Sequence, residues 1–335
     1  MKKMISLFLA LVLILSLTAC GGATEGSTKA LENAPVAANY PAKPITCIVP
    51  FTAGGGTDVI ARMMSSVFPT YCDGGTLVVE NQAGGAAVPG TIAVKDASND
   101  GYTISYSFQA NWTMRQHVLE SADYTLDDFT LICGIELQHN GIFVNADSPF
   151  KTIQDLMDYA KANPGKLKYS TGPAASYQEI VANGFMMATG IDALNVPYDG
   201  ARQAALGMMA GDLDFTILQA TTYSSELGAG SVRMLCSFED TTYIEGIPTA
   251  KELGLEKCTF SHRSLIFGPA NLPEDVVLKL EAAFKGICED ETFIKLATNS
   301  NADIQFVDHK TLLEETKAQD YTCIEIIKAT MTFVR

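Results

Sequence analysis

Short strands alternate with amphipathic helices along most of the chain, as the order of its hydrophobic and polar positions indicates. The apolar run Ile45–Val49 is typical of a buried strand. After a triple-glycine turn, apolar residues recur at helical spacing from Val59 to Val67. Residues 152–155 resemble a capping box that opens a helix ending at residue 162. The other predicted elements are strands 77–80, 102–107, 141–145, 167–170, 194–196, 215–218 and 232–237, helices 176–189 and 201–210, and a mainly helical region from residue 273.

This alternation places the chain in the α/β class. Parallel strands that are joined by helices form sheets with helices on both faces. In such folds the ligand lies outside the carboxyl ends of the strands. The turns that lead from a strand into a helix are therefore the places where we expect binding residues.

The N-terminal segment has the pattern of an export signal. Residues 1–3 are Met-Lys-Lys, and residues 5–19 form an apolar run that is short for a helix spanning ~30 Å of hydrocarbon. Small residues then precede Cys20, as in a bacterial lipoprotein box, where the cysteine is lipidated and becomes the mature first residue. The alternative is a plain signal peptide with an incidental cysteine. We expect a signal peptide at 1–19, a lipidated N-terminus with a flexible spacer at 20–39, and a protein anchored at the extracytoplasmic face of a bacterial membrane, in the periplasm or at the cell surface.

Composition narrows the classes of partner. The 335 residues fit two domains of ~150 residues each. With 38 acidic and 23 basic residues, the chain carries a formal charge of −15 and would repel polyphosphate, which argues against nucleic-acid binding. Cys20 is one of eight cysteines, and no two of them form a C-x-x-C pair, so zinc binding and thiol redox chemistry have no support. We therefore expect no metal and no cofactor.

The turn after the first strand, residues 50–58, contains three consecutive glycines. Glycines let backbone N–H groups approach a ligand without obstruction by a Cβ atom. The following helix N-terminus adds unpaired donors and a positive dipole end, which suits an anion. The alternative is a tight turn in which Thr57 or Asp58 caps the helix. The turn lacks the Lys-Ser/Thr of a P-loop and the G-x-G-x-x-G spacing of a dinucleotide site, which argues against both kinds of cofactor.

Two later turns also lie between a strand and a helix. In the first of them, Thr171 and Ser176 offer hydroxyl groups and Gly172 allows close backbone approach, although Ser176 is equally suited to capping the helix. In the second, Tyr198 is placed either to wall a pocket or to pack in the core. The neighbouring Arg202 is placed either to reach an anion or to face solvent. The local pattern leaves these alternatives open.

The landmarks of the chain resemble those of a known family. The first are Tyr-Pro-Ala-Lys-Pro-Ile at 40–45, Val-Pro-Phe and Gly-Gly-Gly-Thr-Asp within 49–58, and Val-Glu-Asn-Gln-Ala-Gly-Gly at 79–85. The later ones, in order, lie at 100–104, 160–167, 196–198, 211–214, 247–255 and 268–270. Together they are similar to the substrate-binding proteins of tripartite tricarboxylate transporters, the Bug or TctC-like family, over residues 40–335.

The resemblance implies a type II periplasmic-binding-protein fold, with two lobes that each hold a mixed, mostly parallel sheet flanked by helices and with the ligand in the cleft between them. Lobe 1 would comprise residues 40–145 and 262–335 and lobe 2 residues 146–261, with hinge strands near Asn145 and Ser261. It also implies a receptor that holds a small carboxylate and delivers it to a membrane permease with one large and one small subunit. We expect a monomer that closes around its ligand.

The contacts that the resemblance implies fall on the three turns and on the end of the third strand. The set in the first lobe is Phe51, Ala53, Gly54, Gly55, Thr57, Asp58, Ser107 and Gln109. The set in the second lobe is Thr171, Gly172, Ser176, Tyr198, Asp199 and Gly200. Relatives commonly have lysine at the place of Asp199, an acid that favours an amine on the ligand unless it faces solvent. Arg263 is placed either to bind the anion or to lie at the surface.

Three other functions compete with this interpretation. An enzyme is the first, and the sequence argues against it, because its four histidines form no H-E-x-x-H motif and no serine lies in G-x-S-x-G. No catalytic residue is therefore expected. The second is a receptor of the same fold that serves an ABC importer or acts as a ligand sensor, with an amino acid among its ligands. The third is a purely structural surface lipoprotein, which would bind no small molecule.

Overall fold

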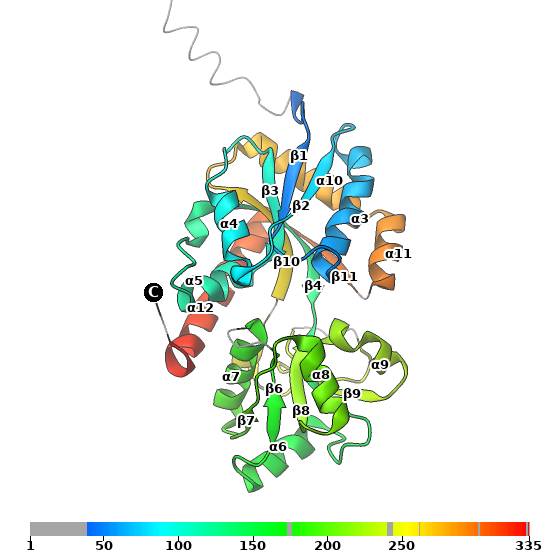
Figure 1. Cartoon of the computed structure of the whole chain (residues 1–335), viewed down its shortest axis with the longest axis vertical. Helices are drawn as coiled ribbons and strands as arrows, with labels where there is room; N and C mark the ends of the chain where they lie inside the picture. The colour runs from blue at the N-terminus through cyan, green and yellow to red at the C-terminus, as the bar shows by residue number, and fades with distance from the viewer. Residues whose placement is uncertain are drawn as a thin grey trace, which may run out of the picture. The chain divides into compact units, whose positions relative to one another are not determined.

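The computed structural model describes residues 39–172, 176–239, 244–260, 262–300, 302–332 and 334. The predicted signal peptide, Cys20, the spacer up to residue 38 and the predicted hinge residue Ser261 lie outside these residues. Pro41–Arg335 forms one compact unit, in which two mixed β-sheets are flanked by helices (Figure 1). No helix in the described part of the chain is long and apolar enough to cross a membrane.

The first sheet has six strands. They are β1 Ile45–Val49, β2 Leu77–Asn81, β3 Thr103–Phe108, β4 Phe129–Gln138, β10 His262–Pro269 and β11 Asp303–Asp308, in the order β11-β4-β10-β3-β1-β2. β1 is parallel to β2 and β3, whereas β10 is antiparallel to β3 and β4, and β11 is antiparallel to β4. Because β1 and β3 are parallel neighbours, the turns that follow them lie at the same edge of the sheet.

Helices surround this sheet, and α3 packs against α10 and α11. Their bounds are α3 Gly56–Tyr71, α4 Val88–Lys95, α5 Gln116–Val118, α10 Glu274–Cys288, α11 Glu291–Asn299 and α12 His309–Thr330, with short turns η2 Gly85–Ala87 and η4 Leu126–Asp128 and a π-helical turn η3 Asn111–Arg115. The ring of Trp112, which is fully buried, makes edge contacts with Phe129 and Phe267 in the core. This packing fixes η3 against the sheet.

The second sheet has five strands. They are β5 Asn140–Asn145, β6 Lys168–Ser170, β7 Leu194–Asn195, β8 Phe215–Gln219 and β9 Val232–Ser237, in the order β7-β6-β8-β5-β9. β6 is parallel to β7 and β8, and β5 is antiparallel to β8 and β9. The turns after β6 and β8 therefore lie at one edge of this sheet.

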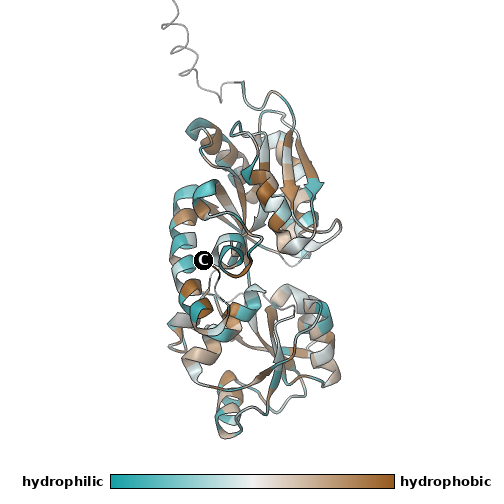
Figure 2. Cartoon of the chain, turned by 60° about the vertical axis from the view of Figure 1, so that its left-hand side comes forward, coloured by the Kyte–Doolittle hydropathy of each residue, from teal (hydrophilic) through white to brown (hydrophobic). Residues whose placement is uncertain are grey.

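The two faces of the second sheet are covered by different helices. The helices are α6 Ile153–Ala162, α7 Tyr177–Thr189, α8 Ala201–Ala210 and α9 Ser224–Gly228, with short turns η5 Ala220–Tyr223 and η6 Glu256–Cys258. Ile142 and Val144 of β5 join the core under α6 and α7, whereas Phe143 joins the core under α8. This alternation is the expected period of two for a strand that is buried on both faces. In Figure 2 the strands are mostly brown, whereas the helices carry teal stretches.

The chain passes from the first sheet to the second at a single residue, because β4 ends at Gln138 and β5 begins at Asn140. Helix α12 also contacts both parts, since its residues Ile326 and Ile327 belong to the core under α7. β5 lies within the residues predicted for lobe 1 and is a strand of the second sheet. The limits of the lobes stay a prediction.

Most predicted elements are confirmed within one or two residues at their ends. Three strands were missed, namely β4, β10 and β11, and β11 interrupts the region that was expected to be mainly helical. These strands supply the antiparallel pairs of the first sheet, which are more frequent than a mostly parallel sheet implies. The capping box of α6 is confirmed, since Asp155 N–H donates to Thr152 Oγ1 at 3.1 Å and Thr152 N–H donates to the Asp155 carboxylate at 2.8 Å.

Candidate functional site

Two adjacent cavities, of about 480 Å³ and about 170 Å³, lie at the edges of the sheets where the predicted turns are found. Phe108, at the end of β3, and Gln219, at the end of β8, line both cavities. Residues of the first and the second sheet therefore contribute to each of them. This position agrees with the rule that ligands bind outside the carboxyl ends of strands.

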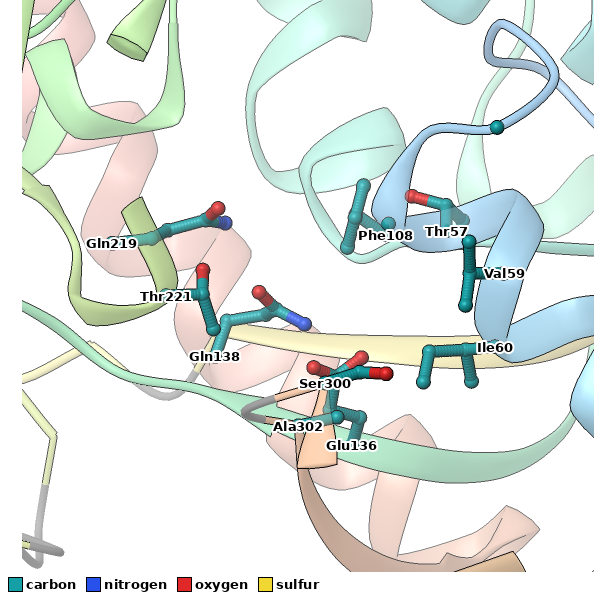
Figure 3. Close-up of a pocket in the computed structure, with 12 residues that line it drawn as sticks. Thr57, Val59, Ile60, Phe108, Glu136, Gln138, Gln219, Thr221, Ser300 and Ala302 are labelled. Atoms are coloured by element: carbon teal, nitrogen blue, oxygen red, sulfur yellow. The ribbon is translucent and has the colours of Figure 1, made fainter. Parts of the chain in front are cut away.

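The larger cavity is lined by both polar and apolar residues, and none of its described lining residues is basic (Figure 3). Its polar side chains include the Glu136 carboxyl and the amides of Gln138 and Gln219. The complete described lining is Gly54, Gly56, Thr57, Val59, Ile60, Phe108, Glu136, Gln138, Gln219, Thr221, Ser300 and Ala302.

The smaller cavity contains one basic group, Arg115, beside the first residues of two helices. Ser176 precedes α7 and Ala201 begins α8, and the N-cap residues of the two helices, Ser176 and Gly200, make no side-chain capping hydrogen bond. The complete described lining is Phe51, Phe108, Ala110, Arg115, Thr171, Ser176, Tyr177, Gln178, Ala201, Leu218, Gln219 and His262. Uncapped helix N-termini leave backbone N–H groups free for an anion.

Asp58 holds the glycine turn in place from the first turn of α3. Its carboxylate is buried and accepts hydrogen bonds from Gly54 N–H at 2.8 Å, Arg62 Nε at 3.0 Å and Asn81 Nδ2 at 2.9 Å. The hydrogen bond from Arg62, followed by those from Gly54 and Asn81, lowers the pKa of Asp58 to about 2 against the cost of burial. Gly54 N–H is therefore used within the protein, and Gly55 N–H donates to the Thr52 carbonyl at 3.2 Å.

We expect Asp58→Asn to destabilise the fold by about 1–3 kcal/mol at pH 7, because the variant loses a charge-assisted tie to the turn and to Arg62. Asp58 has a pKa of about 2 in the folded protein and an ordinary value of about 3.9 when unfolded, so its contribution is present above pH 4 and is lost as the pH falls towards 2. Urea unfolding at pH 7 and pH 3 measures both effects. Asp199→Asn, at an exposed acid, is the matched control and should change the stability by less than about 0.5 kcal/mol. Equal stability of wild type and Asp58→Asn at pH 7 would contradict this role.

Ser107 and Gln109 face the interior, although the resemblance placed them at the ligand. Ser107 is fully buried and its Oγ accepts from Asn111 Nδ2 at 3.2 Å. Gln109 uses both ends of its amide, since its Oε1 accepts from Arg263 N–H at 2.9 Å and its Nε2 donates to Thr316 Oγ1 at 3.0 Å. Arg263 is buried and pairs with Glu315 at 3.0 Å, so it is neither a surface residue nor part of either cavity lining.

The turn after β6 is brought to the smaller cavity through Thr171 and Ser176. Ser176 Oγ donates to the Thr171 carbonyl at 3.3 Å, so it does not cap α7. Gly172 has a φ of 81°, and its carbonyl accepts from Tyr198 N–H at 3.1 Å. This hydrogen bond joins the turn before α7 to the turn before α8.

The turn before α8 places its three predicted residues away from both cavities. Tyr198 packs against the core under α8, with its hydroxyl beside Gly207. Asp199 is exposed, and Gly200 precedes the first residue of α8. Arg202 pairs with Glu226 at 2.7 Å, so it is not free to bind an anion. Ala53 and Gly55, on the first turn, are also absent from the described linings, whereas Phe51, Gly54 and Thr57 belong to them.

Sequence reasoning missed Arg115, which ends the π-helical turn η3. Its guanidinium donates to Asn111 Oδ1, and no carboxylate of the described residues lies within ion-pair distance of it. Arg62, Arg202 and Arg263, by contrast, each pair with an acid. The hydropathy of the region after β3 gives no indication that Arg115 reaches a cavity.

His262, at the start of β10, forms an aromatic wall beside Arg115. Its ring stacks on those of Tyr177 and Phe108, with distances of 3.8 Å and 5.4 Å between the ring centroids. Phe108 in turn makes an edge contact with Phe51. Burial, with a smaller effect from the charge of Arg115, lowers the pKa of His262 to about 3. His262 is therefore neutral at pH 7, and Arg115 supplies the positive charge of the smaller cavity.

Comparisons with known proteins found matches at the level of family and fold. The family model described as "Tripartite tricarboxylate transporter family receptor" matches residues 62–329. A UPF0065 protein of Bordetella pertussis is 25% identical over 266 residues, which cover 79% of this chain and 82% of that protein. A TctC solute binding protein from Polaromonas has a TM-score of 0.78 at 22% identity, covering 87% of this chain and 99% of that one. Rpa4515 of R. palustris, solved with adipate, has a TM-score of 0.72 at 22% identity, covering 86% and 97%.

The family match confirms the resemblance inferred from the landmarks of the sequence. The structural matches confirm the α/β periplasmic-binding-protein fold with two mixed sheets flanked by helices. Family and fold are those of solute-binding receptors, which confirms that the chain is not an enzyme.

Proposed function

Because the chain belongs to the tripartite tricarboxylate transporter receptor family, we propose that it captures a small carboxylate in the two adjacent cavities and delivers it to a membrane permease with one large and one small subunit. The name of the family supports a transport role. Adipate, the ligand of Rpa4515, supports a carboxylate as the ligand class. We further propose a lipoprotein that is anchored through Cys20 on the extracytoplasmic face of the membrane.

The observation that carries this proposal is the smaller cavity, where Arg115 lies beside the N-termini of α7 and α8. Each helix N-terminus acts as roughly half a positive charge, and a guanidinium donates two parallel hydrogen bonds to a carboxylate. Thr171 adds a buried hydroxyl group. The chain as a whole is strongly acidic, but the local field decides where an anion binds.

Binding by closure is supported by the origin of the lining residues. Phe108 ends β3 of the first sheet and Arg115 follows it. In the second sheet, Gln219 ends β8, and Thr171 and Ser176 follow β6. A ligand that contacts both groups favours the arrangement in which they approach each other, and this shifts the population towards it. We propose Arg115, Phe51, Thr57, Thr171 and Ser176 as ligand contacts, with Asp58 as a positioning residue for the first turn.

A panel of small carboxylates tests the proposal by thermal unfolding of the purified protein. A ligand at 100 times its Kd stabilises the folded state by about 2.7 kcal/mol, which is readily measured. We expect stabilisation by at least one small carboxylate among the dicarboxylates, tricarboxylates and amino acids, and none by uncharged amides of the same length. A cooperative transition that no carboxylate shifts would contradict the proposal and favour the structural lipoprotein.

The same fold serving an ABC importer or a ligand sensor is the alternative partner assignment. It leaves the ligand site unchanged and replaces the permease. Crosslinking of the membrane-anchored protein in cells, followed by identification of the captured membrane protein, separates these cases. Capture of a two-subunit permease supports the proposal, and capture of an ATP-driven importer or a sensor kinase contradicts its transport part.

A further inference from the structure

Glu136 places a carboxyl group in the larger cavity, whereas the described lining of the smaller cavity contains no acidic residue. Its side chain is 7% exposed and lines the cavity together with Gln138 (Figure 3). Glu136 Oε2 accepts from Tyr106 Oη at 3.1 Å and from Ser264 Oγ at 3.3 Å. A carboxylate has about four acceptor positions, so this group keeps capacity for a donor from a ligand.

The larger cavity has few positive groups that would attract an anion or neutralise the Glu136 carboxylate. None of its described lining residues is basic, and the helix dipole of α3 is the favourable feature for an anion there. Asp58 in the first turn of α3 offsets that dipole, because its buried carboxylate is ionised at pH 7 and binds Gly54 N–H. The anion site therefore lies at the Arg115 end, and the Glu136 end suits a hydrogen-bond donor or a cation.

We infer that the ligand is an amino acid with a terminal amine, whose carboxylate binds at Arg115 and whose ammonium binds at Glu136. This inference rests on the proposed function and specifies its ligand class. Phe108 lines both cavities and offers an apolar surface to the methylene groups between the two charges. The oxygens of Gln138, Gln219 and Thr221 are further acceptors for the ammonium hydrogens.

Because Glu136 ionises near neutral pH, the affinity for a ligand with an ammonium group should change with pH, and this change identifies the ligand class. Burial raises the pKa of Glu136 to about 7, and Asp303 on β11 adds to the increase. Hydrogen bonds from Tyr106 on β3, Ser264 on β10 and Gln138 on β4 oppose it. An ammonium ligand binds the ionised form, so its apparent affinity rises with the ionised fraction, about tenfold between pH 6 and pH 8. A second carboxylate would instead need the protonated form and bind more tightly at pH 6.

Calorimetric titration of the full-length protein with matched probes tests the inference. The probes are 4-aminobutanoate, 5-aminopentanoate and 6-aminohexanoate, the dicarboxylates succinate, glutarate and adipate, and the monocarboxylates butanoate, pentanoate and hexanoate. We expect one amino acid to bind at least tenfold more tightly than its matched dicarboxylate at pH 8, and to lose about tenfold at pH 6. Glu136→Gln, which keeps the size of the side chain, should lower its affinity about tenfold at pH 8 and remove the pH dependence.

Asp212→Asn is the matched control, because Asp212 is an exposed acid outside both cavity linings, and Asp199→Asn tests the acid that the resemblance placed at the ligand. Tighter binding of a dicarboxylate than of every amino acid at pH 8 would overturn the inference and leave the proposed function intact. An affinity of the wild-type protein for amino acids that does not change with pH would also overturn the inference and leave the proposed function intact. This measurement does not depend on whether Glu136→Gln folds. Loss of binding in Asp199→Asn would move the amine to Asp199 and overturn the role of Glu136. If no probe of any class binds, the proposed function itself fails.

Discussion

Replacement of Arg115 by methionine is expected to weaken carboxylate binding at least 100-fold, equivalent to about 2.8 kcal/mol. The guanidinium lines the smaller cavity and is not matched by an acid among the described residues, so its charge is available to a ligand. Truncating one member of a desolvated charge pair typically costs 2–5 kcal/mol or more. Methionine keeps much of the length and apolar contact of the side chain, which limits the change to the charge and its hydrogen bonds. Calorimetric titration with the carboxylate that gives the largest thermal stabilisation measures the loss.

Two further variants separate a specific contact from a general effect of charge. Arg115→Lys keeps the charge but loses the planar fork, so we expect an intermediate loss of about tenfold. Arg202→Met removes an exposed arginine that pairs with Glu226 and lines neither cavity, and its affinity should remain within about twofold of wild type. If Arg115→Met binds within threefold of wild type, the anion site is not the smaller cavity.

Local sequence pattern was sufficient where an element is defined by its own residues. Ile45–Val49 and the helix after it were predicted because a buried parallel strand is a continuous apolar run and the following helix has a strong period. The capping box at Thr152 was readable for the same reason, since both of its partners lie within one turn.

The missed strands depend on partners that are distant in the sequence. β10 begins with the polar residues His262, Arg263 and Ser264, which are buried although they are polar; all three pair with β4, and Ser264 also pairs with β3. β11 is half-buried throughout and pairs only with β4, so its pattern alone does not distinguish it from a helix. Tertiary pairing decided these elements, and local propensity did not.

The binding site likewise combines residues that the local sequence predicts with residues that only the tertiary fold brings together. The turns were found because glycine and hydroxyl residues between a strand and a helix have a local physical meaning, and Gly54, Thr57, Thr171 and Ser176 do line the cavities. Arg115 and Glu136 lie inside a helical turn and a strand, where nothing in the neighbouring residues distinguishes a cavity-lining charge from a solvated one. Only the fold brings the ends of β3, β4 and β8 to one place. The resemblance predicted the turns of the site but not the two charged groups that give its ends opposite character.

Gly172→Ala should weaken binding at least tenfold, because the turn before α7 and the first residue of α8 would be forced apart. Gly172 has a φ of 81°, and an added Cβ would lie 3.2 Å from both the Cα and the N of Ala201. Both are backbone atoms, so the contact is relieved only by moving the start of α8. Ala201 lines the smaller cavity, and the displacement would change the spacing of the two helix N-termini that face the carboxylate.

Gly190→Ala provides the matched control for backbone strain. Gly190 has a φ of 67° at the end of α7, and a Cβ there would have no atom within 4 Å. Both variants should lose about 1–2 kcal/mol of stability through the left-handed conformation, measured by urea unfolding, but only Gly172→Ala should lose affinity. Equal affinity of the two variants would show that the spacing of α7 and α8 does not control binding. A loss confined to Gly172→Ala would assign the carboxylate to the space between these helices, because strain is common to both variants and contact with Ala201 is not.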